Sequence, residues 1–400
     1  MKKRVPLLVL TIAMLIMSIV GSASASSLSV DMEQLTTDIA GYVSAWVVDN
    51  YSEHYSLSHY SGEVAECEVK GSQFRAAVPV VVYTTLKYSS AESLPYMEGM
   101  KDALNIASFG DIASVASADR SGEFSRILSE SNPNLDTEIV DDLAATLSSR
   151  YSDVEECIGT PTELFVDFVV TGHIVKGKMD KVSLYVDETG ALIDASLYAP
   201  KSAEALADEG RSDTLNMLQE AAQRNEGPSE RYYAYYDRID ARDYALEWTS
   251  DATTYCGCEE NVYGIDHDCW NNDEYPYFTE ICHADCADYV SQAMHAGGIP
   301  IDPGVWERCQ DGDSGYGEYG WTWTAVDALQ EYMIDKGYWD TSTYAVCNAG
   351  NILMTSSQHV VMVTLNDTVT HRYSGHTRDR RDCQFTNGAG YLYYAIKTSP

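Results

Sequence analysis

The residues whose types and spacing could do chemistry begin in the stretch 284–300. There, Asp285 and Asp288 suit the start of an α-helix, and Gly297 suits its end. Cys286 therefore falls in the first turn of a predicted helix. Unpaired backbone N–H groups and the positive end of the helix dipole favour a thiolate at that position, and the thiolate is the nucleophilic form of cysteine. From its position alone, Cys286 is equally compatible with a half-cystine or a packed thiol.

A histidine can serve as the base for such a nucleophile, and His359 is suitably placed. It opens the β-branched run 359–365, which predicts a central strand. A histidine at the end of a core strand can face the N-terminus of a helix. Taken alone, His359 is also compatible with an ordinary hydrogen-bonded histidine. The pair predicts acyl chemistry, in which a thiolate attacks an acyl carbon and an imidazolium protonates the leaving amine.

Together with blocks elsewhere in the chain, these residues resemble the bacterial putative amidase domain family, which is similar to papain-like cell-wall hydrolases of the NlpC and CHAP types. The resemblance covers about residues 236–379. It rests on Tyr236-Asp237-Arg238 with Tyr244-Ala245, Asp285 through Gln292, Gly297 through Pro300, Trp321, Trp323, His359-Val360-Val361, His376-Thr377 and Asp379.

The resemblance implies a papain-like α+β fold in which a helix bearing the cysteine packs on an antiparallel sheet. It also implies that Cys286 is the nucleophile, His359 the general base and His376 the third, orienting group. Three further residues of the same blocks are expected to support the substrate or the oxyanion: Asp285, Gln292 and Asp379. No cofactor is expected, and no metal ligand is assigned.

The predicted reaction is hydrolysis of an amide bond in peptidoglycan or a related extracellular peptide, and this substrate rests on family analogy. A cell-wall peptide or other extracellular peptide is thus the expected partner. The family usually has Gly-Asp before the histidine strand, where this chain has Gly350-Asn351. The departure bears on substrate preference more than on the chemistry. The alternative function is a non-catalytic, disulfide-stapled secreted binding or adhesion module in which Cys286 is oxidised.

The chain has ten cysteines. Because an exported chain can oxidise its thiols, most are expected in disulfides, and Cys67 is predicted to pair with Cys157 because no other cysteine lies in the first half. A zinc site is the alternative for the residues Cys256, Cys258, His267, Cys269, Cys282 and His283. Their spacing matches no standard pair of Cys-x-x-Cys zinc knuckles, so disulfides are favoured there.

The N-terminus predicts export. A basic start, an apolar run over 7–20 and a small-residue site ending at Ala25 are typical of a signal peptide, so the mature chain is expected to be secreted or held at the cell surface. No later stretch approaches the roughly 20 apolar residues of a stable membrane span. The formal net charge of −35 argues against a nucleic-acid partner, and the oligomeric state is left open.

The elements that must position the site are expected in a second domain. The predicted organisation is a signal peptide over 1–25, an α+β N-terminal domain over 26–200, a helical, polar linker over 201–231 and a papain-like amidase domain over 232–400. Turn formers at 225–229 mark the boundary. Helical patterns in the first domain lie near 32–49, 92–106 and 136–149, and strand-like runs lie near 74–88, 164–175, 182–186 and 192–198. Within the first run, Pro79 suggests an edge or a break.

The arrangement of the histidines depends on one predicted turn. A two-residue turn directly after Leu365 would pair Met362 with His371 on the next strand. His376 would then share the sheet face of His359, and His371 would point to the other face. A bulge in the second strand would reverse the two faces.

Overall fold

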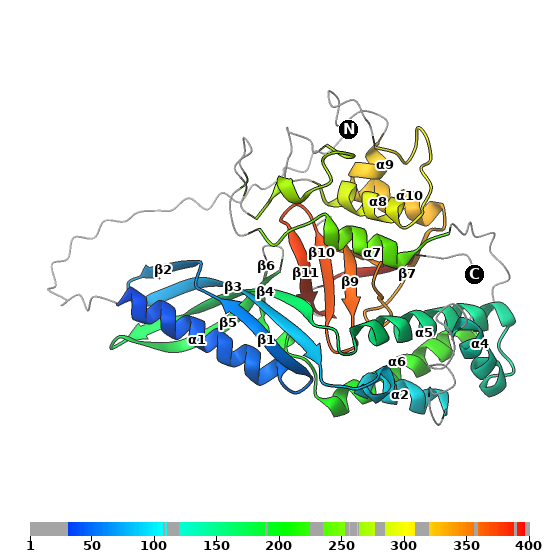
Figure 1. The fold of residues 1–400 in the computed structure, drawn as a ribbon, viewed down its shortest axis with the longest axis horizontal. Helices are drawn as coiled ribbons and strands as arrows, with labels where there is room; N and C mark the ends of the chain where they lie inside the picture. Colours follow the sequence, from blue (N-terminus) through cyan, green and yellow to red (C-terminus); the bar gives the residue numbers. More distant parts are fainter. Residues whose placement is uncertain are drawn as a thin grey trace, which may run out of the picture.

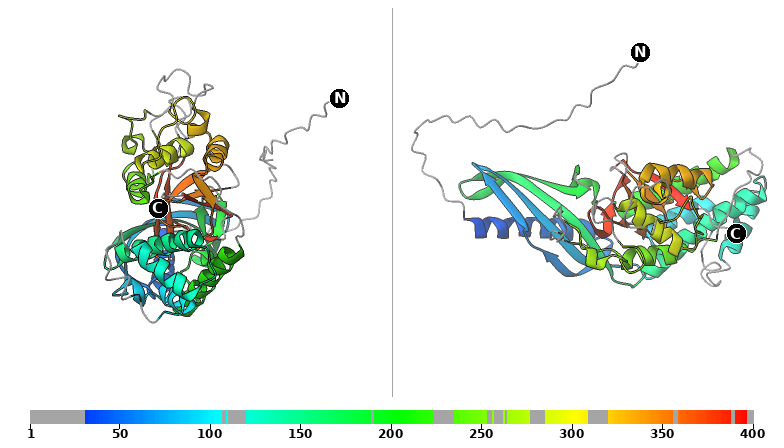
Figure 2. Two further views of the ribbon diagram at one scale, coloured as in Figure 1. Left: turned by 90° about the vertical axis from the view of Figure 1, so that its right-hand side faces the viewer. Right: turned by 90° about the horizontal axis from the view of Figure 1, so that it is seen from above.

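The computed structural model describes residues 31–106, 109, 120–188, 191–223, 235–252, 256, 262, 264–276, 285–308, 320–355, 359–387 and 390–396. The predicted signal peptide and the turn formers at 225–229 lie outside these ranges. Within them, helices and strands form an elongated molecule around a 12-stranded, mostly antiparallel sheet (Figures 1 and 2). The predicted α+β class is confirmed.

The first half of the chain contains one helix, a group of strands and then a group of helices. Asp31 caps the first helix by accepting a hydrogen bond from the backbone N–H of Gln34 at 3.1 Å. In chain order, the elements are α1 (Met32–Tyr51), β1 (Tyr55–Gly62), β2 (Glu66–Lys70), β3 (Gln73–Leu86), η1 (Ala91–Ser93), α2 (Pro95–Leu104), α4 (Arg120–Ser131), α5 (Thr137–Cys157), β4 (Thr162–Val175), β5 (Lys178–Glu188), β6 (Ala191–Asp194), η3 (Ala195–Leu197) and α6 (Ala203–Gln223).

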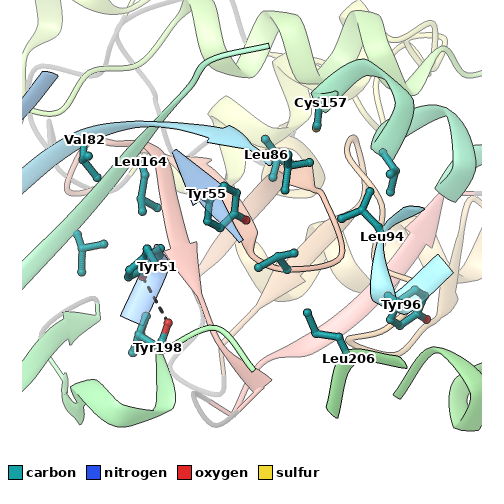
Figure 3. Close-up of a cluster of buried hydrophobic side chains, with 14 of the residues drawn as sticks. Tyr51, Tyr55, Val82, Leu86, Leu94, Tyr96, Cys157, Leu164, Tyr198 and Leu206 are labelled. Carbon is teal, nitrogen blue, oxygen red and sulfur yellow. Dashed lines mark hydrogen bonds between the residues drawn. The ribbon is translucent and has the colours of Figure 1, made fainter. Parts of the chain in front are cut away.

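The core of the first half lies between α1 and the long strands. The buried side chains of α1 recur on one helical face: Leu35, Ile39, Val43, Val47 and Tyr51. β3 buries every second residue from Phe74 to Leu86, the alternation of a strand with one covered face. Figure 3 shows this core where Tyr51, Tyr55 and Tyr198 lie near apolar side chains of β3 and β4.

The second half places helices on one side of a group of strands. Figure 1 shows α7 and α8 on one side of β9 and β10, and α5 and α6 of the first half on the other side. The elements are α7 (Arg238–Glu247), η4 (His267–Cys269), α8 (Cys286–Ala296), α9 (Trp321–Thr324), α10 (Val326–Asp335), β7 (Trp339–Thr341), β8 (Ile352–Met354), β9 (Val360–Asn366), β10 (His371–Gly375), β11 (Arg380–Phe385) and β12 (Leu392–Ile396).

The two halves share one sheet. β11 pairs with β4 in parallel, with Cys383 opposite Phe165, whereas the other pairs of described strands are antiparallel. Arg372 of β10 is fully buried at this junction. Its guanidinium bonds to Asp382 Oδ2 at 3.1 Å and to Thr84 Oγ1 at 2.8 Å. Because a buried charge needs such partners, β10 depends on a group from the first half.

The predicted linker contains α6, which packs closely against α2. Two glycines allow this approach, because a Cβ atom at Gly99 would lie 1.9 Å from the carbonyl oxygen of Ala207, and one at Gly210 would lie 2.1 Å from that of Tyr96. The helical character predicted for this segment is therefore present, and its packing lies in the first half. The division into two domains stays a prediction.

Pro79 marks a break in the pairing on one side of β3, one of the two possibilities that its sequence suggests. It lies opposite Asp167 of β4, but on the other side of β3 the pairing with β2 ends at Ala77 and that with β1 begins at Val80, so no ladder bond there needs its missing N–H. The predicted disulfide between Cys67 and Cys157 is wrong, because both cysteines are free.

Cys67 and Cys157 cannot form a disulfide because they lie near opposite ends of the long strand β3. Cys67 lies opposite Ala76 near one end of that strand, while Cys157 lines a cavity with Tyr83 near the other end. Seven residues of strand separate these points by roughly 23 Å, and a disulfide needs Cα atoms within about 7 Å. Among the described residues, no helix is long and apolar enough to cross a membrane.

Candidate active site

The predicted catalytic helix is α8, and it packs on the sheet as expected. Cys286 is its first residue, and Gly297 ends it, with its N–H bonded to the carbonyl of Ala293 at 3.0 Å. The side chains that α8 and β9 bury in a common core include Cys286, Tyr289, Val290, Ala293, Met294, Val360 and Met362. A thiol at the start of a helix is therefore held against a central strand.

Asp285 has a different role from the helix cap that the sequence suggests. It occupies the N-cap position of α8, but its side chain makes no capping hydrogen bond. Its Oδ2 instead lies 2.7 Å from Nδ1 of His376, and Nε2 of that ring lies 2.7 Å from the carbonyl oxygen of Trp248. The imidazole is stacked between two aromatic rings, with centroids 4.1 Å from Trp270 and 4.0 Å from Tyr289. His376 is thereby fixed next to the start of α8.

The hydrogen bonds of His376 fix the position of one of its protons. A carbonyl oxygen only accepts, so Nε2 must carry a proton that it donates to Trp248. Burial raises the pKa of Asp285 well above its usual value, and the nearby Asp288 carboxylate raises it further. Burial lowers the pKa of His376. Both shifts favour a neutral pair in which Asp285 holds the second proton and donates it to Nδ1.

Asp379 supports this arrangement from behind the aromatic stack. Its carboxylate accepts from Nε1 of Trp270 at 3.1 Å, from Oγ of Ser250 at 2.8 Å and from the backbone N–H of Asp266 at 2.9 Å. Burial raises the pKa of Asp379, and the neighbouring His376 lowers it. Asp379 thus fixes the Trp270 ring that covers His376.

The thiol of Cys286 is buried, with 8% of the residue exposed. Burial raises its pKa, while the backbone N–H of Val360, the hydroxyl of Thr377 and the backbone N–H of Ala287 lower it. The sequence predicts that the helix start favours a thiolate. Groups that lower the pKa are present, but the loss of solvent outweighs them, so the net shift favours the protonated thiol.

His359 precedes β9, and its ring lies on the other face of the sheet. Side chains of β9 alternate between the core shared with α8, which contains Val360, and a second core, which contains Val361. A Cβ atom placed on Gly375 would lie 2.6 Å from Cγ1 of Val361 and 4.0 Å from Nε2 of His359, so the ring shares the face of Val361. Burial, and then Arg380, lowers the pKa of His359 to about 4.

The structure therefore brings Asp285, Cys286, His376 and Asp379 into one region and leaves the His359 ring apart. Between the described atoms of Cys286 and His359 there is no hydrogen bond. The backbone of His359 is nevertheless near the thiol, because the N–H of Val360, the next residue, lowers the pKa of Cys286.

The predicted register of β9 and β10 is wrong. Met362 pairs with Ser374, not with His371, and the ladder shifts between Arg372 and Tyr373. The predicted two-residue turn is replaced by a four-residue loop, 367–370, in which Asp367 Oδ1 accepts from two backbone N–H groups. His376 consequently faces α8, which is the face of Ser374 and not that of His359.

Comparison with known families finds a match, and it includes this site. Residues 235–397 match the sequence profile of the putative amidase domain family. This part of the chain is therefore similar to the putative amidase domain. The match confirms the resemblance predicted over 236–379. No curated protein and no solved structure matches the chain.

Within the amidase domain, Gln292 lies away from the thiol. Its Oε1 accepts from the hydroxyl of Tyr244 on α7 at 2.7 Å, and that hydroxyl also accepts from Nδ2 of Asn271 at 3.1 Å. Gln292 therefore joins α7 to α8, which indicates a positioning role. Asp288 also acts within the domain, since it accepts from Nε1 of Trp323 at 2.5 Å and from Nε of Arg308 at 3.0 Å.

One residue of the amidase domain received no role from the sequence, although it lies against the thiol. Thr377 has a φ of 87°, a conformation that is rare for a β-branched residue and that often marks a functional site. Its Oγ1 is buried and has no partner of normal hydrogen-bond geometry among the described groups. The only signal for it in the sequence is its position directly after His376.

The described part of the amidase domain also bears on the alternatives. Cys269, Cys286, Cys347 and Cys383 are free. No group of three or more His, Cys, Asp or Glu side chains in the described residues could hold a metal ion. Three members of the zinc alternative, Cys258, Cys282 and His283, lie outside the described residues.

Proposed function

We propose that the amidase domain hydrolyses an amide bond by a cysteine mechanism, with Cys286 as the nucleophile. The observation that carries this proposal is the place of Cys286 at the start of α8, packed on β9, where the nearby N–H groups of Ala287 and Val360 and the hydroxyl of Thr377 lower the pKa of its thiol. Such donors stabilise a thiolate or the oxyanion formed when sulfur attacks an acyl carbon. The family match supports amide chemistry.

His359 is the proposed general base. A pKa near 4 leaves its ring neutral at neutral pH, which is the form that can accept a proton from the thiol. His376 is less suited, because both of its nitrogens already have partners in Asp285 and Trp248. The proposal requires the His359 side chain to move toward the thiol before it can accept the proton.

His376 and Asp285 are proposed as a positioning pair. Asp285 directly precedes the nucleophile, so its bond to a rigidly stacked imidazole fixes the backbone at the start of α8. Fixed backbone donors are worth more to a developing negative charge than mobile ones, because they need no reorganisation during the reaction. Asp379 contributes to the same rigidity through Trp270.

The proposed substrate is a peptide amide in peptidoglycan or a related extracellular peptide. The predicted signal peptide and the family resemblance support it. The test is digestion of purified peptidoglycan with the full mature chain and with Cys286→Ala, followed by mass spectrometry of new end groups. New amine and carboxyl ends that require Cys286 are expected. If the wild-type chain leaves both wall material and peptides intact, the proposal is rejected. A Cys286 that is oxidised and does not react with an alkylating reagent would favour the binding module.

A further inference from the structure

A second buried site lies at the other end of β10, far from Cys286. A cavity of about 70 Å³ opens there between α5 and α6 of the first half and the loop that joins β9 to β10. Arg150, Thr368 and His371 all line it, and none has more than 5% of its surface exposed. The amidase chemistry uses none of these residues.

Polar atoms of all three side chains are without partners. Nη2 of Arg150, Oγ1 of Thr368 and both ring nitrogens of His371 are buried and make no hydrogen bond of normal geometry with any described group. Native proteins rarely leave buried polar atoms unsatisfied, and a cluster of them around one cavity calls for an occupant. The occupant must accept hydrogen bonds, because a guanidinium can only donate.

The charge of Arg150 indicates the sign of that occupant. Its Nε donates to Oδ1 of Asn348 at 2.9 Å, but it takes part in none of the ion pairs within 4.0 Å that join the described residues. Two carboxylates also line the cavity: Glu209 is paired with Lys201 at 2.5 Å, and Asp213 accepts from the hydroxyl of Tyr96 at 3.2 Å. Asp213 interacts with Arg150 electrostatically but forms no ion pair with it within 4.0 Å. A buried guanidinium without an anion in contact is costly, so a negative occupant beside Arg150 is favoured.

The remaining lining residues can complete an anion site. Burial and then Arg150 hold the pKa of His371 well below its usual value, against the nearby backbone carbonyl of Tyr344, which raises it. The neutral ring has one N–H, which donates either to that carbonyl or to a ligand in the cavity. Thr368 has a φ of 70°, which is unusual for a β-branched residue, and its backbone N–H is held by Oδ1 of Asn366 at 3.0 Å. This backbone conformation holds the Thr368 hydroxyl at the cavity.

We propose that this cavity binds one small monovalent anion, either chloride or a carboxylate as small as formate or acetate. Arg150 provides the charge, and Thr368 and His371 provide further donors. One water needs about 10–15 Å³ of such space, so the cavity has room for a small anion but not for a nucleotide or a sugar. Because its walls come from both halves of the chain, binding stabilises their association.

The test uses the full mature chain and does not depend on amidase activity. The melting temperature is measured at constant ionic strength while gluconate is replaced by chloride, formate or acetate. We expect a saturable rise with at least one of the small anions, and the three arms distinguish halide from carboxylate. Arg150→Met should abolish the rise, whereas Arg126→Met, which removes an exposed, ion-paired arginine on α4, should retain it.

If Arg150→Met does not fold, His371→Phe provides a second variant, because it keeps an aromatic ring at this position and removes both ring nitrogens. A crystal soaked in bromide gives a direct readout, and an anomalous peak within hydrogen-bond distance of Arg150 is expected. Equal melting temperatures in all anions, with no anomalous peak, would show that the cavity holds ordered water only and would overturn the proposal. Neither outcome bears on the role of Cys286.

Discussion

β10 has a buried histidine at each end, and the two differ in their surroundings more than in their burial. His371 begins the strand and has no described partner of normal geometry for either ring nitrogen. His376 follows the strand, bonds at both nitrogens and is stacked between two aromatic rings. Burial lowers the pKa of both. Burial alone therefore does not define a functional histidine, and the partners decide whether the ring positions a nucleophile or is open to a ligand.

The most complete way to test this comparison is to remove the nucleophile and each histidine in turn. Cys286→Ala and His359→Ala are expected to lower amide turnover by at least about 10³-fold, because the attacking sulfur or its base is lost. His371→Ala is the matched control and should retain turnover within about threefold. Circular dichroism checks the folding of each variant. A folded but inactive His371→Ala variant would mean that His371 takes part in amide hydrolysis, so that both ends of β10 belong to one functional site.

The next effect concerns the pair that His376 forms with Asp285. His376→Ala leaves the Asp285 carboxyl and the Trp248 carbonyl without a hydrogen-bond partner and empties the space between two aromatic rings. We therefore expect a loss of about 3–5 kcal/mol in the free energy of unfolding, together with a large fall in turnover. Asp285→Asn separates the two possible proton arrangements. If Asp285 is protonated, an amide that donates to Nδ1 replaces it with little loss of stability in urea titrations. A loss as large as that of His376→Ala would indicate an imidazolium and a carboxylate instead.

The pH dependence of turnover distinguishes the proposed base from an ordinary histidine. His359 must be neutral to accept the proton, and its pKa is lowered to about 4. Activity should therefore be complete at pH 6.5, the usual titration point of histidine, and should be lost as the pH falls through about 4. The measurement is kcat/KM between pH 3 and 8, with unfolding followed in parallel. An acid limb near 6.5 in folded protein would mean that the His359 ring is solvated in the active form.

The smallest effect is expected at Thr377. Thr377→Val keeps the branched shape and removes the hydroxyl, so the pKa of the Cys286 thiol should rise and turnover should fall by about tenfold. Thr377→Ser retains the hydroxyl and should stay close to wild type. The rate of iodoacetamide labelling against pH, read at Cys286 by peptide mapping, measures the thiol directly. Identical profiles for the valine and serine variants would exclude a role for the hydroxyl.

Sequence reasoning located the elements better than it located the contacts between them. Local signals sufficed for α1, with its Asp31 cap, and for α8, which ends at Gly297, because caps and periodicity act over a few residues. The family segment was also predicted and is confirmed. The predicted register of β9 and β10 was wrong. An Asx-type loop and a bulge, which residue propensities do not indicate, shift the pairing so that the side chains of β10 lie on the opposite sheet faces from those predicted.

The contacts of the charged side chains were equally out of reach of the sequence. Asp285 is a good helix cap by type, yet its carboxyl turns to His376, which lies 91 residues further along the chain. The raised pKa of the Cys286 thiol follows from burial under elements that the helix pattern does not include. Local patterns predict what a residue can do, and the tertiary neighbours select among those possibilities.

The parallel pairing of β4 with β11 has a consequence for the order of events in folding. Phe165 and Cys383, which face each other across this pair, are more than 200 residues apart in the chain. Closing so long a loop is slow, because its entropy must be lost before the contact rewards it. The first half can collapse early, but the N-terminal part of β4, which β5 does not cover, must wait for β11. A growing or truncated chain that lacks β11 would expose this part of the strand, so the pairing of β11 is the step that protects it from pairing with other chains.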